Sequence, residues 1–101
     1  MQKYKTVAEL LRDPKRWCKG HYAVDAGGDT CAVDDPKAAK WCLVGACERV
    51  YGRLHCGLAV GKLRNALNCA TIGGGSSPAC FNDLPTTTYE DIMAVVEKAG
   101  V

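Results

Sequence analysis

The chain has 101 residues, which is enough to bury one hydrophobic core and predicts a single domain over residues 1–101. Hydrophobic residues make up 48% and charged residues 24% of the sequence, and these values exclude an intrinsically disordered chain. The formal net charge is only +2 and no basic stripe is interleaved with aromatic residues, so nucleic-acid binding is disfavoured.

The first segment, MQKYKTVAELLRD, contains no apolar run of signal-peptide length. No stretch of the chain approaches the roughly 20 apolar residues that a membrane helix needs. We therefore expect a cytoplasmic protein without a membrane partner.

The beginning of the chain predicts a helix followed by a hairpin. Thr6 and Glu9 have the spacing of a reciprocal capping box, so the first helix is expected to begin at Thr6. The strand-forming residues of segments 22–24 and 31–33 flank Gly27 and Gly28, which suit a tight turn. These features predict a short β-hairpin.

A second helix is predicted between Asp35 and Gly52, because Asp35 and Pro36 suit its first positions and Gly52 its end. Helical periodicity gathers small and apolar residues on one face, namely Ala39, Cys42, Leu43, Ala46, Cys47 and Val50. Their small size predicts a closely packed neighbouring helix. Trp41 falls on the other face, so it is either covered by the hairpin, which we favour, or exposed for recognition.

A third helix is predicted over residues 53–69, with apolar residues on two sides. One side forms the core stripe, and the other carries Leu54 and Leu58, as expected of a central helix or of one with a homodimer contact. Gly57 and Gly61 would permit close contact between backbones.

A fourth helix is predicted from the segment TTTYEDIMAVVEKAG, with Thr87 and Glu90 as its capping box. Ile92, Val95 and Val96 share its buried face, and Gly100 terminates it. The expected fold is mainly α with a small β-hairpin (α+β), arranged as a compact four-helix single domain.

The seven cysteines have a spacing that argues for packing. Their count is odd, no secretory signal is present and no C-x-x-C pair occurs, so we expect reduced thiols. His21 and His55 form no H-x-x-x-H motif, and we predict no metal and no cofactor. Free cysteine behaves as a small buried hydrophobe. That role is expected for most of Cys18, Cys31, Cys42, Cys47, Cys56, Cys69 and Cys80.

Asn82 and Asp83 admit two interpretations. Both residue types bond nearby backbone amides, so they suit a turn ahead of Pro85 for local reasons. Alternatively, they line a polar pocket together with Trp17, His21 and Trp41. No spacing of nucleophiles, histidines and carboxylates singles out a catalytic set, so we do not expect an enzyme.

Three segments carry a family resemblance: RWCKGHYAVDAGG, DDPKAAKWCLVGACERV and CFNDLPTTTYEDIMAVVEKA. Together they resemble a family of small domains of unknown function encoded by bacteria and their phages. The matching positions are Trp17, Gly20, Trp41, Cys42, Gly45, Ala46, Phe81, Asn82 and Asp83. The chain departs from that pattern at Phe81, where tryptophan is usual, and in its many cysteines. The resemblance supports the fold and leaves the function open.

Two hypotheses about function follow. The first is a non-enzymatic interaction module, a modulator of a host protein that presents an aromatic and basic surface. The second is a protein that binds a small nucleotide-like anion through aromatic stacking, two arginines and the amides of GGGSSP, residues 73–78. The candidate binding residues are Trp17, His21, Trp41, Arg53, Arg64, Asn82 and Asp83.

Overall fold

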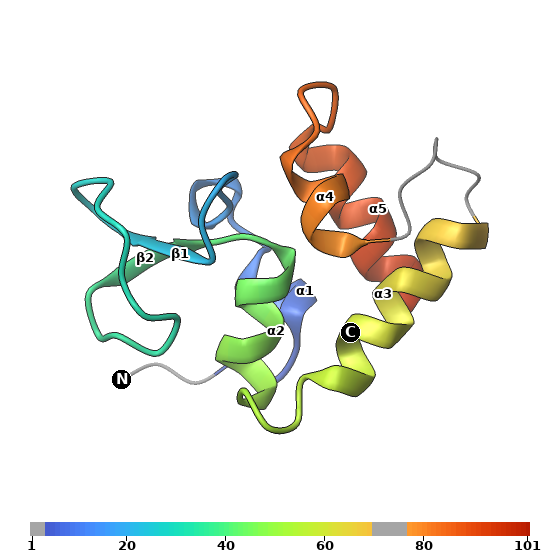
Figure 1. The fold of residues 1–101 in the computed structure, drawn as a ribbon, viewed down its shortest axis with the longest axis horizontal. Helices are drawn as coiled ribbons and strands as arrows, with labels where there is room; N and C mark the ends of the chain where they lie inside the picture. The colour runs from blue at the N-terminus through green and yellow to red at the C-terminus, as the bar shows by residue number, and fades with distance from the viewer. Residues whose placement is uncertain (1–3, 70–76) are drawn as a thin grey trace.

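A two-stranded antiparallel hairpin lies at one end of the molecule, and helices fill the rest (Figure 1). The computed structural model describes residues 4–69 and 77–101. In chain order these residues form α1 (Val7–Leu10), the 3-10 turn η1 (Pro14–Arg16), β1 (Ala23–Asp25), β2 (Ala38–Trp41), α2 (Leu43–Tyr51), α3 (Gly57–Cys69), α4 (Pro78–Asp83) and α5 (Tyr89–Ala99). The predicted fold class, mainly α with a small β-hairpin, is confirmed.

Helix α1 begins as the sequence predicts, with half of the expected capping box. The Thr6 hydroxyl accepts a hydrogen bond from the Glu9 amide at 3.0 Å. The Glu9 carboxylate accepts from the Lys5 amide at 3.4 Å, one residue before the expected partner. The cap therefore satisfies amides on both sides of Thr6.

The hairpin has a different second strand from the one predicted. Strand β1 pairs with β2, and Ala23 stands opposite Trp41. Of the predicted pairing between segments 22–24 and 31–33, the structure has one hydrogen bond, from the Cys31 amide to the Ala23 carbonyl at 3.1 Å, next to an isolated bridge between Val24 and Thr30. The expected glycine turn is present, since Gly28 has a φ of +89° and donates its amide to the Asp25 carbonyl.

Helix α2 is shorter than predicted, because the residues expected to form its first turn are strand β2. It begins at Leu43 and ends before Gly52, the terminator that the sequence predicts. Cys42 caps its first turn, since the Cys42 sulfur accepts from the Gly45 amide at 3.3 Å. The predicted start at Asp35 is therefore wrong, because strand β2 occupies residues 38–41 and the helix begins after it.

Trp41 is a core residue that reaches the interior from a strand. Its side chain is only 5% exposed, and its indole Nε1 donates to the Val33 carbonyl at 2.9 Å. The expectation that Trp41 is covered is confirmed. The helical position that we assigned to it is wrong, because the alternation of a strand places it inside.

The small residues of α2 make room for the hairpin. A methyl group at Gly45 would lie 1.9 Å from the Tyr22 carbonyl oxygen, a distance that no side chain tolerates. The same carbonyl accepts from the Cys42 amide at 3.3 Å. The backbone before β1 is thus a close neighbour of α2 at Gly45, and helices α1, α3 and α4 also pack against α2, so the predicted helical neighbour is present.

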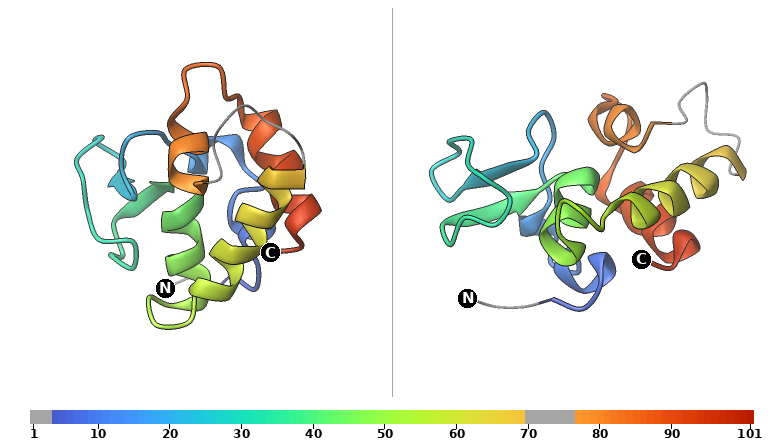
Figure 2. Two further views of the ribbon diagram at one scale, coloured as in Figure 1. Left: turned by 45° about the vertical axis from the view of Figure 1, so that its right-hand side comes forward. Right: turned by 60° about the horizontal axis from the view of Figure 1, so that its bottom comes forward.

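Helices α3 and α5 pack side by side at the end of the molecule away from the hairpin (Figure 2). Leu63 and Leu67 of α3 are buried in the core, as predicted. Leu54 and Leu58 are 91% and 74% exposed, so the second apolar side of this segment is uncovered. A methyl group at Gly61 would meet no atom within 4 Å, so the predicted close backbone contact at Gly57 and Gly61 is absent.

Helix α4 replaces the turn that the sequence predicts around Asn82 and Asp83. The capping box of α5 is displaced by one residue from the prediction, since it uses Thr88 and Asp91. Thr87 donates its hydroxyl to the Phe81 carbonyl at 2.7 Å instead, which ties α4 to the start of α5.

The core joins residues from every α-helix and both strands. The predicted buried face of α5 is confirmed at Ile92, Val95 and Val96, and Gly100 ends the helix in the left-handed conformation. Helix α1 packs against α2 and α5. None of the described helices is long and apolar enough to cross a membrane.

Candidate functional site

Asn82 is the hub of a buried polar network. Its side chain is fully buried. The side-chain oxygen, Oδ1, accepts hydrogen bonds from Trp17 Nε1 at 2.6 Å and from the Leu43 amide at 3.1 Å. Its Nδ2 donates to the Cys18 carbonyl at 3.0 Å and to Asp83 Oδ1 at 2.9 Å. The amide group thus uses its full ordinary capacity of two accepted and two donated bonds.

Two further bonds fasten the same two segments together. Lys19 Nζ donates to the Leu84 carbonyl at 2.6 Å and lies 5.6 Å from the centre of the Trp17 ring. The Gly20 amide donates to Asp83 Oδ1 at 2.9 Å. We call the contact between residues 17–20 and 82–84 the clasp.

Gly20 has the backbone conformation that the clasp requires. Its φ is +82°, a left-handed value that side-chain-bearing residues rarely adopt. The chain turns at Gly20. The Gly20 amide donates to the Asp83 carboxylate, and the residues before it bond to Asn82 and Leu84. Glycine is therefore needed here for backbone geometry, since space around it is open.

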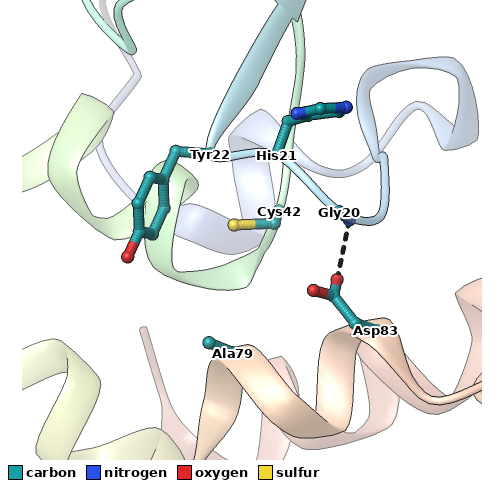
Figure 3. Close-up of a pocket in the computed structure, with 6 residues that line it drawn as sticks. All are labelled: Gly20, His21, Tyr22, Cys42, Ala79 and Asp83. Atoms are coloured by element: carbon teal, nitrogen blue, oxygen red, sulfur yellow. Dashed lines mark hydrogen bonds between the residues drawn. The ribbon is translucent and has the colours of Figure 1, made fainter. Parts of the chain in front are cut away.

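A pocket of about 250 Å³ opens beside the clasp (Figure 3). It is lined by Gly20, His21, Tyr22, Cys42, Ala79 and Asp83. In Figure 3 the Tyr22 ring and the Ala79 methyl group border it on one side, and the second carboxylate oxygen of Asp83 faces the space between Cys42 and Ala79. The His21 ring turns away from this space, and its Nδ1 lies 3.2 Å from Thr30 Oγ1.

The thiols at this site are poor nucleophiles. Burial raises the pKa of the Cys42 thiol, and the nearby Asp83 carboxylate raises it further. Burial likewise raises the pKa of Cys18 to about 11, with Cys42 adding to the effect. Since the thiolate is the reactive form, both groups remain protonated at neutral pH.

Four of the predicted binding residues lie in the clasp or line the pocket, the backbone of Trp41 pairs with that of Trp17, and the two arginines lie elsewhere. His21 and Asp83 line the pocket, while Trp17 and Asn82 lie behind it in the clasp. Trp41 faces the core and does not line the pocket.

The two arginines do not reach this pocket. Arg53 lies in the turn after α2, where it pairs with Glu48 at 3.5 Å, and Arg64 is exposed on α3. Of the predicted anion-binding loop, residues 73–76 lie outside the described residues. Neither arginine lines the pocket beside the clasp, and most of the loop of the predicted anion site lies outside the described residues.

A second surface surrounds the exposed leucines, for which the sequence analysis considered a homodimer contact. Leu54 stands in the turn before α3, and Leu58 in its first turn borders a hollow of about 110 Å³ with Tyr51, His55 and Lys62. No acidic residue occurs between Glu48 and Asp83 in the sequence. We call the surface formed by Arg53, Leu54, His55, Leu58 and Lys62 the leucine surface.

The cysteine side chains that the structure describes are all free thiols: Cys18, Cys31, Cys42, Cys47, Cys56 and Cys80. The side chain of Cys69 lies outside the described part of the chain. Within that part, no group of three histidine, cysteine or acidic side chains is placed to hold a metal ion.

Comparison with known proteins identifies the family. Residues 2–100 match the model of a family of unknown function, DUF6197. No curated protein and no solved structure matches the chain. The chain belongs to the DUF6197 family, which carries no assigned activity.

Proposed function

We propose that this chain is a non-enzymatic interaction module that binds an acidic, amphipathic segment of a partner protein through the leucine surface. The observation that carries the proposal is the exposure of Leu54 and Leu58, at 91% and 74%. Two large apolar side chains exposed in one short segment mark an interaction site more often than single exposed residues do.

The charge around these leucines supports an acidic partner. Lys62 lines the hollow beside Leu58, and Arg53 is exposed although it pairs with Glu48 at 3.5 Å. The sequence contains no acidic residue between Glu48 and Asp83. Opposite charge around an apolar contact steers association and fixes orientation. An acidic helix with one apolar face would place its leucine-sized side chains beside Leu58 and its carboxylates beside Lys62.

The same charge argues against a homodimer through this surface. A two-fold axis through this surface would place the same basic patch on both sides of the interface, so the basic residues of one copy would lie near those of the other. A sedimentation experiment over a range of concentrations tests this alternative directly. A monomer at all concentrations is the expected result.

The cellular setting of the proposal comes from the family resemblance. Small domains of this kind encoded by bacteria and their phages suggest a modulator of a host protein acting in the cytoplasm. The raised pKa of the Cys18 thiol also favours binding over nucleophilic catalysis, because little thiolate is present at neutral pH.

Sequestration of a nucleotide-like anion has weaker support. The pocket of about 250 Å³ has the concave form of a ligand site, but Asp83 contributes a carboxylate to its wall. Neither Arg53 nor Arg64 lines it. A negative wall repels an anion, so the pocket suits another class of ligand.

Native mass spectrometry of the protein purified from bacterial cells tests the proposal. The expected result is a retained protein partner, which Leu58→Glu releases and Ala32→Glu leaves bound. Ala32 is an exposed loop residue, so its variant adds the same charge away from the leucine surface. A retained anionic small molecule, or a partner that the Leu58→Glu variant still holds, would contradict the proposal.

A further inference from the structure

Asp83 carries a charge that its structural contacts do not require. Its Oδ1 accepts from the Gly20 amide and from Asn82 Nδ2, both at 2.9 Å. A carboxamide oxygen would accept the same two bonds, so an asparagine would serve the clasp equally well. Asp83 is an exposed residue, so water solvates its charge wherever no ligand is bound.

The second oxygen of this carboxylate faces the pocket. No described residue donates a hydrogen bond to Asp83 Oδ2, since both bonds to the group reach Oδ1. Figure 3 shows this oxygen directed toward the space between Cys42 and Ala79. A ligand in the pocket meets an acceptor that is already oriented by the clasp.

Among the described residues no side chain forms an ion pair with this carboxylate, and the ion pair of Arg53 with Glu48 does not involve it. Lys19, the lysine of the clasp, donates its ammonium group to the Leu84 carbonyl and lies against the Trp17 ring. The exposed carboxylate is therefore open to an external cation, which would displace water and form a charge-assisted hydrogen bond.

The remaining walls of the pocket are suited to an apolar stem. The Ala79 methyl group and the Cys42 side chain form its floor, and the Tyr22 ring, which is 57% exposed, borders its mouth. The Cys42 thiol stays neutral because burial raises its pKa. A ligand with a cationic head and a short hydrocarbon stem would contact both kinds of wall.

We propose that the pocket beside the clasp binds the ammonium group of a primary alkylamine, with Asp83 Oδ2 as its acceptor and Ala79, Cys42 and Tyr22 around its stem. This site is separate from the leucine surface and does not depend on the proposed protein partner. The same chemistry comes either from a free amine or from a lysine side chain of a bound protein.

A two-dimensional NMR titration with n-butylammonium chloride at constant ionic strength tests the proposal. The expected result is a saturable shift of the Gly20, Ala79 and Asp83 amides, because the Gly20 amide bonds directly to the carboxylate. Asp83→Asn keeps the Oδ1 acceptor and removes the charge, so its affinity should fall about tenfold or more. Asp34→Asn removes the same charge at an exposed residue that does not line the pocket, so it should leave the affinity unchanged.

Two isosteric probes keep the test decisive even if the Asp83→Asn variant does not fold. Neutral 1-butanol and anionic butyrate have similar stems and should bind the wild-type protein about tenfold more weakly, or not at all. The absence of saturable shifts with butylammonium, equal binding of butyrate, or undiminished binding to a folded Asp83→Asn variant would overturn the proposal.

The source of the amine follows from a second titration. A blocked tripeptide with a central lysine presents the same ammonium group on a peptide backbone. Tighter binding of this peptide than of butylammonium assigns the pocket to a lysine side chain of a protein. Equal or weaker binding of the peptide assigns it to a free amine.

Discussion

Asn82 accepts a hydrogen bond from the indole Nε1 of Trp17 across 65 positions of the sequence, at 2.6 Å. The same oxygen accepts from the Leu43 amide at the start of α2. One buried carboxamide therefore joins the segment before the hairpin, the second helix and α4. The order of the pocket wall depends on this single side chain.

Asn82→Ala should destabilise the fold strongly. The change leaves the Trp17 indole and the Leu43 amide without partners, and each orphaned buried donor costs about 1–3 kcal/mol. We expect the free energy of unfolding to fall by about 3 kcal/mol or more, measured by urea denaturation. Asn65→Ala, on the exposed side of α3, should change it by less than about 0.5 kcal/mol. Equal effects of the two variants would contradict the assigned role of Asn82.

Two glycines in helices should respond in opposite directions to alanine. At Gly45 the added methyl group would lie 1.9 Å from the Tyr22 carbonyl oxygen, so the hairpin must move and the protein should lose stability. At Gly61 the methyl group meets open space, and alanine should stabilise helix α3 by about 0.5–1 kcal/mol. Thermal unfolding of the two variants checks both signs. A neutral Gly45→Ala variant would show that α2 does not rest on Tyr22.

Trp41→Ala should cost about 3–5 kcal/mol of unfolding free energy, as other large aromatic truncations do. The indole is 5% exposed and bonds the Val33 carbonyl, so the change removes both packing and a hydrogen bond. Leu54→Ala, at a side chain that is 91% exposed, is the matched control and should unfold at nearly the wild-type temperature. A Trp41→Ala protein that melts within about two degrees of the parent contradicts this assignment.

Stability should decline in alkaline solution because of the buried thiols. Burial raises the pKa of Cys47 from an ordinary 9.0 to about 12. Between these two values the unfolded chain has lost a proton that the folded chain retains, so the free energy of unfolding falls as pH rises. Below pH 9 the contribution is fully present.

Urea denaturation between neutral and alkaline pH measures this slope. Cys47→Ala should make the alkaline decline less steep, and Cys80→Ala, at an exposed side chain, should not change it. A wild-type protein whose stability is constant up to pH 11 would show that Cys47 ionises freely in the folded state.

The parts of the fold that depend on local patterns were predictable. The buried stripe of α5 follows from the spacing of Ile92, Val95 and Val96, and Gly52 and Gly100 end their helices where expected. Two consecutive threonines each have an acidic residue three positions later, so the capping box was ambiguous by one residue. The choice is made by Thr87, whose hydroxyl bonds the distant Phe81 carbonyl.

The parts that depend on contacts between distant segments were not predictable. Residues 38–41 carry a plausible helical pattern, but pairing with β1 makes them a strand. Cys42 then caps α2 through its sulfur, an acceptor that is weaker than the usual capping side chains. The local pattern singles out the pair Asn82 and Asp83, but it does not show that the other three partners of Asn82 come from residues 17, 18 and 43.

The candidate site was predicted only in part, because it also depends on contacts between distant segments. The proposed grouping of Asn82 and Asp83 with Trp17, His21 and Trp41 is close to the observed clasp and pocket, except that the Trp41 side chain faces the core. For Leu54 and Leu58 the sequence left two alternatives open, burial inside the bundle and a homodimer contact. Only the structure shows that this side of the segment is uncovered.

Hydrogen–deuterium exchange of the complex with a captured partner tests the proposed binding surface most directly. The account predicts slower exchange of the amides in residues 52–58, with no change in residues 17–22 and 79–84. Slowing confined to the clasp and pocket, with residues 52–58 unchanged, would contradict binding through the leucine surface.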